Sequence, residues 1–452
     1  MSGSSYGGAR SGRARASHAR YRHAVVVGGG FAGLVTARVL ADHVDQVSVL
    51  DKDTLPDRAA HRAGTPQSRH PHALLARGAA LLEDLFPGLR AELTDQGAPV
   101  SDFGHFPMRY PTGWSPTVRS GLVLQTFSRP LLEFLIRRRV RALRNVTVHD
   151  ATEVTALTTG DARVTGVLAR ARGADRPSAH PADLVVIADG RYSRLPGWLA
   201  EARLPPPRCL RVDGQLAYTS RLYQRRPDRD PGFQASLQAT LAPTTPSGGV
   251  VVAIEDDRWL VCLFGAGGIS APTTPEGFAA YAAALDNPHV KQIVEDCQPI
   301  GAIHRYAGLD GRWHRYDRLA PPLRGLAVVG DALCALNPLY GHGMTVAVQQ
   351  ALVLGEAVTA CPPDRACRVY QRRATRTLLL PWFMSTSLDR GWSPGPAPLT
   401  ARAGRAVLLH LLGRIPTDPD LYRRFLNVQH LTASPLTLLP PVPHRHDQGS
   451  EP

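Results

Sequence analysis

Residues 23–53 constrain the fold of this chain more than any other stretch. They open with an apolar run rich in β-branched residues, 24–27, which predicts a buried strand. A helix is expected over 31–41, and a second short apolar run, 47–50, ends at Asp51. The succession of strand, helix, strand and terminal acid predicts a βαβ unit at the N-terminal end of the fold.

Three glycines join the first strand of this unit to its helix, at the spacing G-x-G-x-x-G. Gly28 permits a tight turn, Gly30 lets the backbone approach a pyrophosphate, and Gly33 lets the helix pack close to the strand. The helix N-terminus offers unpaired N–H groups to phosphates, and the carboxylate of Asp51 can accept hydrogen bonds from ribose hydroxyls. The motif predicts a dinucleotide site and leaves open whether the nucleotide is NAD or FAD.

Composition limits the class of protein. A chain of 452 residues with 43% hydrophobic residues can bury a large core, and we expect two closely joined domains. The net charge of +14 comes almost wholly from arginine, since Lys52 and Lys291 are the only lysines. The arginines are scattered without a nucleic-acid motif, so no nucleic-acid partner is expected. The six cysteines form no C-x-x-C pair, which is typical of a reducing cytoplasm.

The N-terminal residues, the apolar stretches and two histidines lead to further predictions. Residues 1–20, rich in Ser, Gly and Arg, are expected to form a disordered basic tail. No uninterrupted apolar stretch could cross a bilayer, so a soluble, cytoplasmic protein without a membrane span is predicted. His70 and His72 have no neighbouring cysteine or acid cluster, so we interpret them as hydrogen-bonding loop residues and expect no metal site.

Several later segments make up the rest of the chain. Amphipathic helices are predicted from about 72 to 85 and from 128 to 143, and strands dominate from 203 to 303. In 325–358, an apolar strand ends at Gly330-Asp331, and a glycine-containing loop leads into a long helix from about Met344. The remainder is helical and basic, with a Pro-rich tail.

Three separated motifs resemble those of one enzyme family: GGGFAG at 28–33, ADGRYSRLP at 188–196 and GDALCALNPLYGHGM at 330–344. Their order and spacing resemble the group A flavoprotein monooxygenases, related to para-hydroxybenzoate hydroxylase, over about residues 22–390. RAGTPQSRHPHALLARG, DGRYSRLPGWL and NPLYGHGM look closest to a narrower branch. That branch contains polyether epoxidases and decalin-forming flavoprotein cyclases of polyketide pathways.

The resemblance implies an α/β fold with a Rossmann-like FAD-binding domain, an inserted, mainly antiparallel β-sheet substrate domain and a helical C-terminus. The expected divisions are a discontinuous FAD domain at 21–202 and 304–390, a substrate domain at 203–303, and a C-terminal helical segment with its tail at 391–452. The sheet would roof the substrate cavity. NADPH would bind transiently, because no second Rossmann loop exists.

The resemblance also assigns residues to the cofactor. The pyrophosphate would lie on Gly28, Gly30, Phe31, Ala32 and Gly33, and the ribose on Asp51, beside Lys52. Other expected contacts to FAD are Arg62, Gln67, Arg129, Asp189, Gly190, Asp331, Pro338, Gly341, Gly343 and Met344. The family often has Glu where this chain has the shorter Asp51. Tyr340 and His342, in the loop expected to face the flavin, are the catalytic candidates.

Two reactions remain open at this point. The first is oxygenation of a polyketide-type secondary metabolite, by epoxidation of an alkene or by hydroxylation, through a flavin C4a-hydroperoxide made with NADPH and dioxygen. The alternative is a non-redox cyclase that retains FAD and catalyses a [4+2] cycloaddition on a polyene. A halogenase is disfavoured, because the W-x-W-x-I-P signature is absent and neither lysine stands at the expected place.

Overall fold

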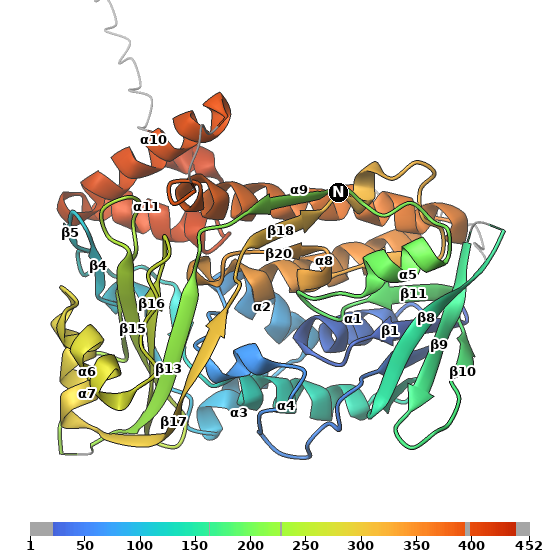
Figure 1. Cartoon of the computed structure of the whole chain (residues 1–452), viewed down its shortest axis with the longest axis horizontal. Helices are drawn as coiled ribbons and strands as arrows, with labels where there is room; N and C mark the ends of the chain where they lie inside the picture. Colours follow the sequence, from blue (N-terminus) through green and yellow to red (C-terminus); the bar gives the residue numbers. More distant parts are fainter. Residues whose placement is uncertain (1–20, 162, 227, 394–397, 440–452) are drawn as a thin grey trace, which may run out of the picture.

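The structure is a computed structural model that describes residues 21–161, 163–226, 228–393 and 398–439. The predicted N-terminal tail and the end of the C-terminal tail therefore lie outside the described residues. Figure 1 shows a parallel sheet with its helices beside a larger antiparallel sheet, and C-terminal helices along one side. The predicted α/β fold is confirmed, with mixed sheets and a helical C-terminal region.

The parallel sheet has five strands in the order β19-β11-β1-β2-β7. Their bounds are β1 His23–Val27, β2 Gln46–Leu50, β7 Val146–His149, β11 Leu184–Ile187 and β19 Leu326–Val328. All four neighbouring pairs are parallel, with Val27 opposite both Ile187 and Leu50. The sequences of the central strands are continuous apolar runs because helices bury these strands on both faces of the sheet.

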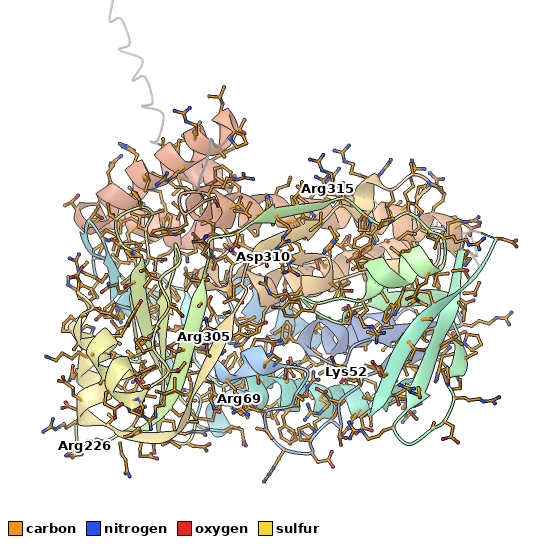
Figure 2. The ribbon with its side chains drawn as sticks, in the orientation of Figure 1. Lys52, Arg69, Arg226, Arg305, Asp310 and Arg315 are labelled. Atoms are coloured by element: carbon orange, nitrogen blue, oxygen red, sulfur yellow. The ribbon has the colours of Figure 1, made fainter. Side chains whose placement is uncertain are left out.

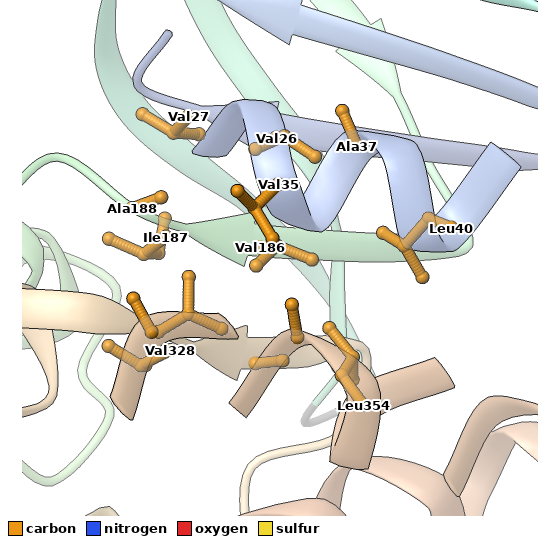
Figure 3. Packing of buried hydrophobic residues seen from close by; sticks show 14 of the residues in the cluster. Val26, Val27, Val35, Ala37, Leu40, Val186, Ile187, Ala188, Val328 and Leu354 are labelled. Atoms are coloured by element: carbon orange, nitrogen blue, oxygen red, sulfur yellow. The ribbon is translucent and has the colours of Figure 1, made fainter. Parts of the chain in front are cut away.

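Helices α1 (Phe31–Ala41), α4 (Arg129–Arg141), α8 (His342–Ala360) and α9 (Pro363–Asp389) pack in the same core as this sheet. Figure 3 shows Val35 and Leu40 of α1 over Val186 of β11, with Leu354 of α8 below. The two helices approach so closely that a Cβ on Gly355 would lie 2.6 Å from Val39 Cγ1. Ser128 caps α4, with its hydroxyl accepting from Leu131 N at 3.3 Å.

The second sheet has seven strands in the order β17-β13-β16-β15-β14-β4-β5. Their bounds are β4 Met108–Tyr110, β5 Gly113–Trp114, β13 Ala217–Gln224, β14 Ala235–Gln238, β15 Ser247–Ile254, β16 Arg258–Gly265 and β17 Gln298–Ala307. Every pair is antiparallel except β14 with β4. The sheet therefore takes two short strands from outside 203–303, and the domain division stays a prediction.

Two helices that the sequence analysis did not name, α6 (Pro275–Ala283) and α7 (Pro288–Asp296), form a core with the seven-stranded sheet. Strand alternation divides that sheet into two faces. Tyr223, Val251 and Val261 contact the α6/α7 side, while Tyr218, Cys262 and Phe264 belong to a separate cluster that includes Leu339. The second face is the one turned toward the parallel-sheet domain.

Smaller elements complete the fold. Three further sheets are formed by β8 Thr152–Gly160, β9 Arg163–Ala171 and β10 Ser178–Pro181; by β12 Cys209–Val212, β18 Gly311–His314 and β20 Cys334–Ala335; and by β3 Val100–Asp102 with β6 Val123–Gln125. The remaining α-helices are α2 Ala76–Leu85, α3 Leu89–Asp95, α5 Leu195–Glu201, α10 Leu399–Arg414 and α11 Pro419–Gln429. Among the described helices, none combines the length and apolar character needed to cross a bilayer.

Candidate functional site

A cavity of about 290 Å³ runs along the carboxyl ends of the parallel strands, where ligands bind in open α/β sheets. It brings together the three separated motifs of the sequence. Sixteen of the predicted cofactor-binding residues line it: Gly28, Gly30, Phe31, Ala32, Asp51, Lys52, Arg62, Gln67, Arg129, Asp189, Gly190, Asp331, Pro338, Gly341, Gly343 and Met344. Gly33 does not line the cavity. This grouping is geometric; the binding roles of the residues stay predictions.

Close backbone contacts explain why the turn after β1 requires glycine. Gly28 has φ +108°, and a Cβ there would lie 2.5 Å from the carbonyl oxygen of Ala188. A Cβ on Gly33 would lie 1.8 Å from the carbonyl oxygen of Gly28. Gly33 therefore lets α1 pack against the turn, and Gly28 and Gly30 form the surface that a pyrophosphate would meet.

Asp51 holds the same turn from the next strand. Its Oδ2 accepts from Gly29 N at 2.6 Å, and its Oδ1 accepts from Asp53 N at 2.8 Å. Burial raises the pKa of Asp51, while Arg62 and the two backbone N–H groups act in the opposite direction. Both carboxylate oxygens thus have internal donors, and a ribose hydroxyl would use their remaining lone pairs.

Two arginines on the cavity wall share a buried acid. Arg62 Nη1 lies 2.7 Å from Asp53 Oδ2, and its Nη2 lies 3.7 Å from Glu133 Oε2. Arg129 binds Glu133 Oε1 at 2.8 Å and lies over the ring of Phe31 at 5.0 Å. The Arg62 side chain is 7% exposed, and its Nε–H has no partner in the described part of the chain. An unpaired buried donor is costly, so it favours an acceptor ligand.

The second motif, at the end of β11, forms a turn and is hydrogen-bonded to the loop before α8. Asp189 Oδ2 accepts from Arg194 N at 3.0 Å, and burial raises the pKa of this carboxyl. Arg191 Nη1 donates to the carbonyl of Asp310 at 2.5 Å, and its Nη2 donates to that of Leu336 at 3.1 Å. Arg191 therefore ties the second motif to the loop before α8 and lines the cavity itself.

The third motif places the start of α8 at the far end of the cavity. Gly341 has φ +71°, and a Cβ there would lie 2.8 Å from the Cβ of Ala73. The helix has no side-chain cap, so its first N–H groups are open to an anionic ligand. Burial raises the pKa of Asp331 at the preceding turn, against the opposing charges of Arg191 and Arg129.

The two catalytic candidates do not line the cavity. His342 is fully buried, and its Nε2 lies 3.1 Å from the carbonyl of Gln429 at the end of α11. Tyr340 stacks on His342, with ring centroids 6.5 Å apart. The side chain of His342 thus points toward the C-terminal helices, and a catalytic role for the two residues stays a prediction.

His72, predicted from the sequence to be a hydrogen-bonding loop residue, lines the cavity. Its Nδ1 donates to the carbonyl of His70 at 2.9 Å, which leaves Nε2 as an acceptor. Burial, and then the charge of Arg129, lower its pKa to about 3. The only hint in the sequence that His72 lines a cavity was its position two residues after His70, in a loop rich in Gly and Pro. That spacing alone does not distinguish a cavity side chain from a surface side chain.

The lining fits FAD. Glycines that admit no Cβ, the unpaired Nε–H of Arg62 and the open N-terminus of α8 suit an elongated anionic ligand. When bound, FAD supplies two-electron redox chemistry and the reaction with dioxygen. The chain itself would orient the cofactor and exclude water from it.

Comparisons with known proteins support FAD as the cofactor. Residues 22–197 match the family model described as FAD binding domain. Protein Rv3254 of Mycobacterium tuberculosis is 34% identical over 450 residues, covering 93% of this chain and 92% of that protein. A kynurenine 3-monooxygenase of Salinispora arenicola is 28% identical over 392 residues, covering 79% and 76%.

A solved structure shares the fold. PqsL, a probable FAD-dependent monooxygenase from Pseudomonas aeruginosa, superposes with a TM-score of 0.60 at 16% identity, covering 82% of this chain and 98% of that one. Because Rv3254 is 34% identical over most of both chains, we conclude that this chain belongs to the same family as Rv3254 and carries an FAD binding domain.

Proposed function

We propose that this protein is an NADPH-dependent monooxygenase that epoxidises an alkene, or hydroxylates a ring, in a polyketide-type secondary metabolite. The observation that carries the proposal is the make-up of the cavity at its α8 end. There the lining includes the apolar or aromatic side chains of Tyr306, Leu309, Leu336, Pro338 and Met344. Such a surface suits an apolar, unsaturated substrate next to the redox centre.

The proposed reaction balances simply. NADPH supplies two electrons, one atom of dioxygen enters the carbon skeleton, and the other leaves as water with two protons. Epoxidation of an alkene requires no obligatory acid–base pair from the protein. The protein would position the substrate and exclude water from the cavity, and both require closely packed side chains around the cavity.

The roof above this end supports that task. Tyr218 and Phe264 of the seven-stranded sheet have ring centroids 6.1 Å apart, in an edge arrangement. They belong to a buried cluster with Leu339 of the loop before α8. The roof and the loop are therefore packed together by apolar contacts, and the substrate would enter beside them.

The cofactor side would be held as the family resemblance implies. We propose that the glycine turn and Arg62 bind the pyrophosphate, that Asp51 binds the ribose, and that the start of α8 lies against the flavin ring. The N-terminus of a helix stabilises negative charge on a reduced flavin. Neutral His72 adds an acceptor on the same wall.

The test uses the purified, FAD-loaded protein. Under anaerobic conditions, NADPH should bleach the flavin absorbance, and re-aeration with ¹⁸O₂ and a polyene should give a product carrying one ¹⁸O atom. A phenol in place of the polyene distinguishes ring hydroxylation from epoxidation. A flavin that NADPH never reduces, together with conversion of a polyene without oxygen, would refute the oxygenase and support the redox-neutral cyclase.

A further inference from the structure

Four cationic or cationisable side chains meet beside the cavity, at the contact between the short helix η1 (Pro66–Arg69) and β17. We call them the cationic cluster: His61, Arg69, His70 and His304. Arg69 Nη1 lies 3.1 Å from His304 Nε2, and His61 Nδ1 lies 2.9 Å from Ser68 Oγ. Arg69 and His61 are exposed, so the cluster is open to solvent on one side.

No carboxylate of the described residues pairs with Arg69. The charges that act on the histidines come from Arg69, Arg258 and the histidines themselves. Burial and these like charges lower the pKa of His61 and of His70 to about 4, and they also lower the pKa of His304. His61 and His70 are therefore uncharged near neutral pH, and the positive charge of the cluster is that of Arg69, with which no carboxylate of the described residues pairs. An anion would supply the counter-charge.

The cluster shares its supports with the cavity. Arg69 stands between Gln67 and Pro71, which both line the cavity, and His304 stands two residues before Tyr306, which lines it too. Alternation along β17 places His304 and Tyr306 on one face. His70 connects them, stacking on Tyr306 at 5.7 Å.

His70 also fixes the cluster to the sheet, because its Nδ1 lies 2.7 Å from Ser220 Oγ. Ser220 is directly opposite His304 in the antiparallel pair of β13 and β17. The cluster is therefore built on a rigid strand pair at the cavity wall, and an anion held there has its attached groups directed along that wall.

We propose that the cationic cluster is a subsite for a phosphate group of the nicotinamide dinucleotide phosphate that reduces the flavin. The inference rests on the proposed function, because it assumes NADPH as reductant. Arg69 would turn its donors from His304 to the phosphate, and His304 would gain a proton and donate to the same oxygen atoms. Arginine paired with a second donor is a strong arrangement for phosphate.

The variant Arg69→Gln tests the subsite, and Arg305→Gln is its matched control. Arg305 is exposed and next to His304, but strand alternation puts it on the opposite face of β17. Figure 2 labels Arg69 at η1 and Arg305 on the neighbouring sheet. Both substitutions remove one positive charge. A difference in dinucleotide binding between the two variants therefore depends on where the arginine lies and not on the net charge.

Two measurements on the FAD-loaded protein, without organic substrate, give the readout. The first is titration calorimetry with NADP⁺, and the second is anaerobic stopped-flow reduction by NADPH and by NADH. We expect Arg69→Gln to weaken NADP⁺ and NADPH about tenfold, leaving the limiting reduction rate within about twofold, and Arg305→Gln to change neither. A smaller effect on NADH than on NADPH assigns the 2′-phosphate; equal effects assign the pyrophosphate.

The outcomes separate the two hypotheses. If the wild-type flavin is reduced but Arg69→Gln binds NADP⁺ and NADPH as the wild type does, the subsite is overturned and the oxygenase stands. If NADP⁺ binds in an Arg69-dependent way but no flavin is reduced, the proposed function fails, and the cluster is a dinucleotide-phosphate site that does not serve flavin reduction. If Arg69→Gln weakens only a carboxylate- or phosphate-bearing substrate, the cluster serves that substrate and the proposal is wrong.

Discussion

The amide of Asn337 donates from Nδ2 to Oδ1 of Asp389 at 2.8 Å, and both residues are buried. Asn337 lines the cavity in the loop before α8, and its Oδ1 also accepts from Leu339 N at 2.9 Å. Asp389 is the end of α9. The last residue of one long helix thus holds the loop that leads into another.

This relationship predicts a pH dependence of stability. Burial raises the pKa of Asp389 to about 7, against the opposing hydrogen bond of Asn337. The folded state therefore favours the neutral acid, and the contribution of Asp389 to stability is complete below about pH 4 and is lost as pH rises through about 7. Asp389→Asn should then be more stable than the wild type at pH 8, by at most roughly 4 kcal/mol. Thermal unfolding of both proteins from pH 4 to 8 measures this, and a constant difference in Tm would contradict it.

Asp51 should be needed for FAD retention. It supports the glycine turn through Gly29 N and keeps lone pairs for a ribose. Asp51→Ala is expected to weaken FAD binding by roughly 1.5–3 kcal/mol, the range for hydrogen bonds to a charged group. Fluorescence titration of the apoprotein with FAD gives the affinity. The control Asp364→Ala removes an exposed acid paired with Arg163 and should bind FAD normally; unchanged affinity in Asp51→Ala would refute the ribose assignment.

Gly33 should tolerate no side chain. Its added Cβ would overlap the carbonyl oxygen of Gly28, a backbone atom that cannot rotate away. Gly33→Ala is expected to destabilise the protein by about 3 kcal/mol or more, the upper range for overpacking. Gly197→Ala is the control, because no atom lies within 4 Å of its Cβ position in α5. Equal melting temperatures for the two variants would show that the turn can move.

His72 should act as a neutral acceptor. With its pKa lowered to about 3, the imidazole does not titrate between pH 5 and 9. His72→Ala should loosen FAD binding or shift the flavin absorption bands, and His72→Gln, which keeps an acceptor, should restore part of the effect. Flavin spectra and FAD titrations across pH 5–9 report both changes. A titration step near pH 6.5 that disappears in the variants would mean that His72 is charged in the folded protein.

Local sequence was sufficient for the parts of the site that are made within one βαβ unit. The apolar run before Gly28, the glycine spacing and the acid after the second strand each have a short-range cause, and the structure places them as expected. In all of them, the pattern of apolar residues and the turn chemistry act within a few positions.

Side-chain direction in the loop before α8 was not predictable in this way. Tyr340 and His342 belong to the same glycine-rich segment as the cavity residues Gly341 and Gly343, yet His342 contacts the end of α11 and Tyr340 stacks on His342. The choice depends on where the C-terminal helices lie, some ninety residues later. The same holds for β4, which joins β14 across more than a hundred residues.

By itself, the sequence determined that a dinucleotide unit exists, where its turn, helix and acid stand, and that two further motifs follow. It could do so because backbone conformation at glycines, strand ends and helix starts is decided by local sterics and hydrogen bonding. Only the tertiary structure decided that Arg191 bridges two motifs, that His72 lines the cavity, and that Arg69 contacts His304 and pairs with no carboxylate of the described residues. Those contacts join segments far apart in the chain, and only packing of the whole core sets their distances.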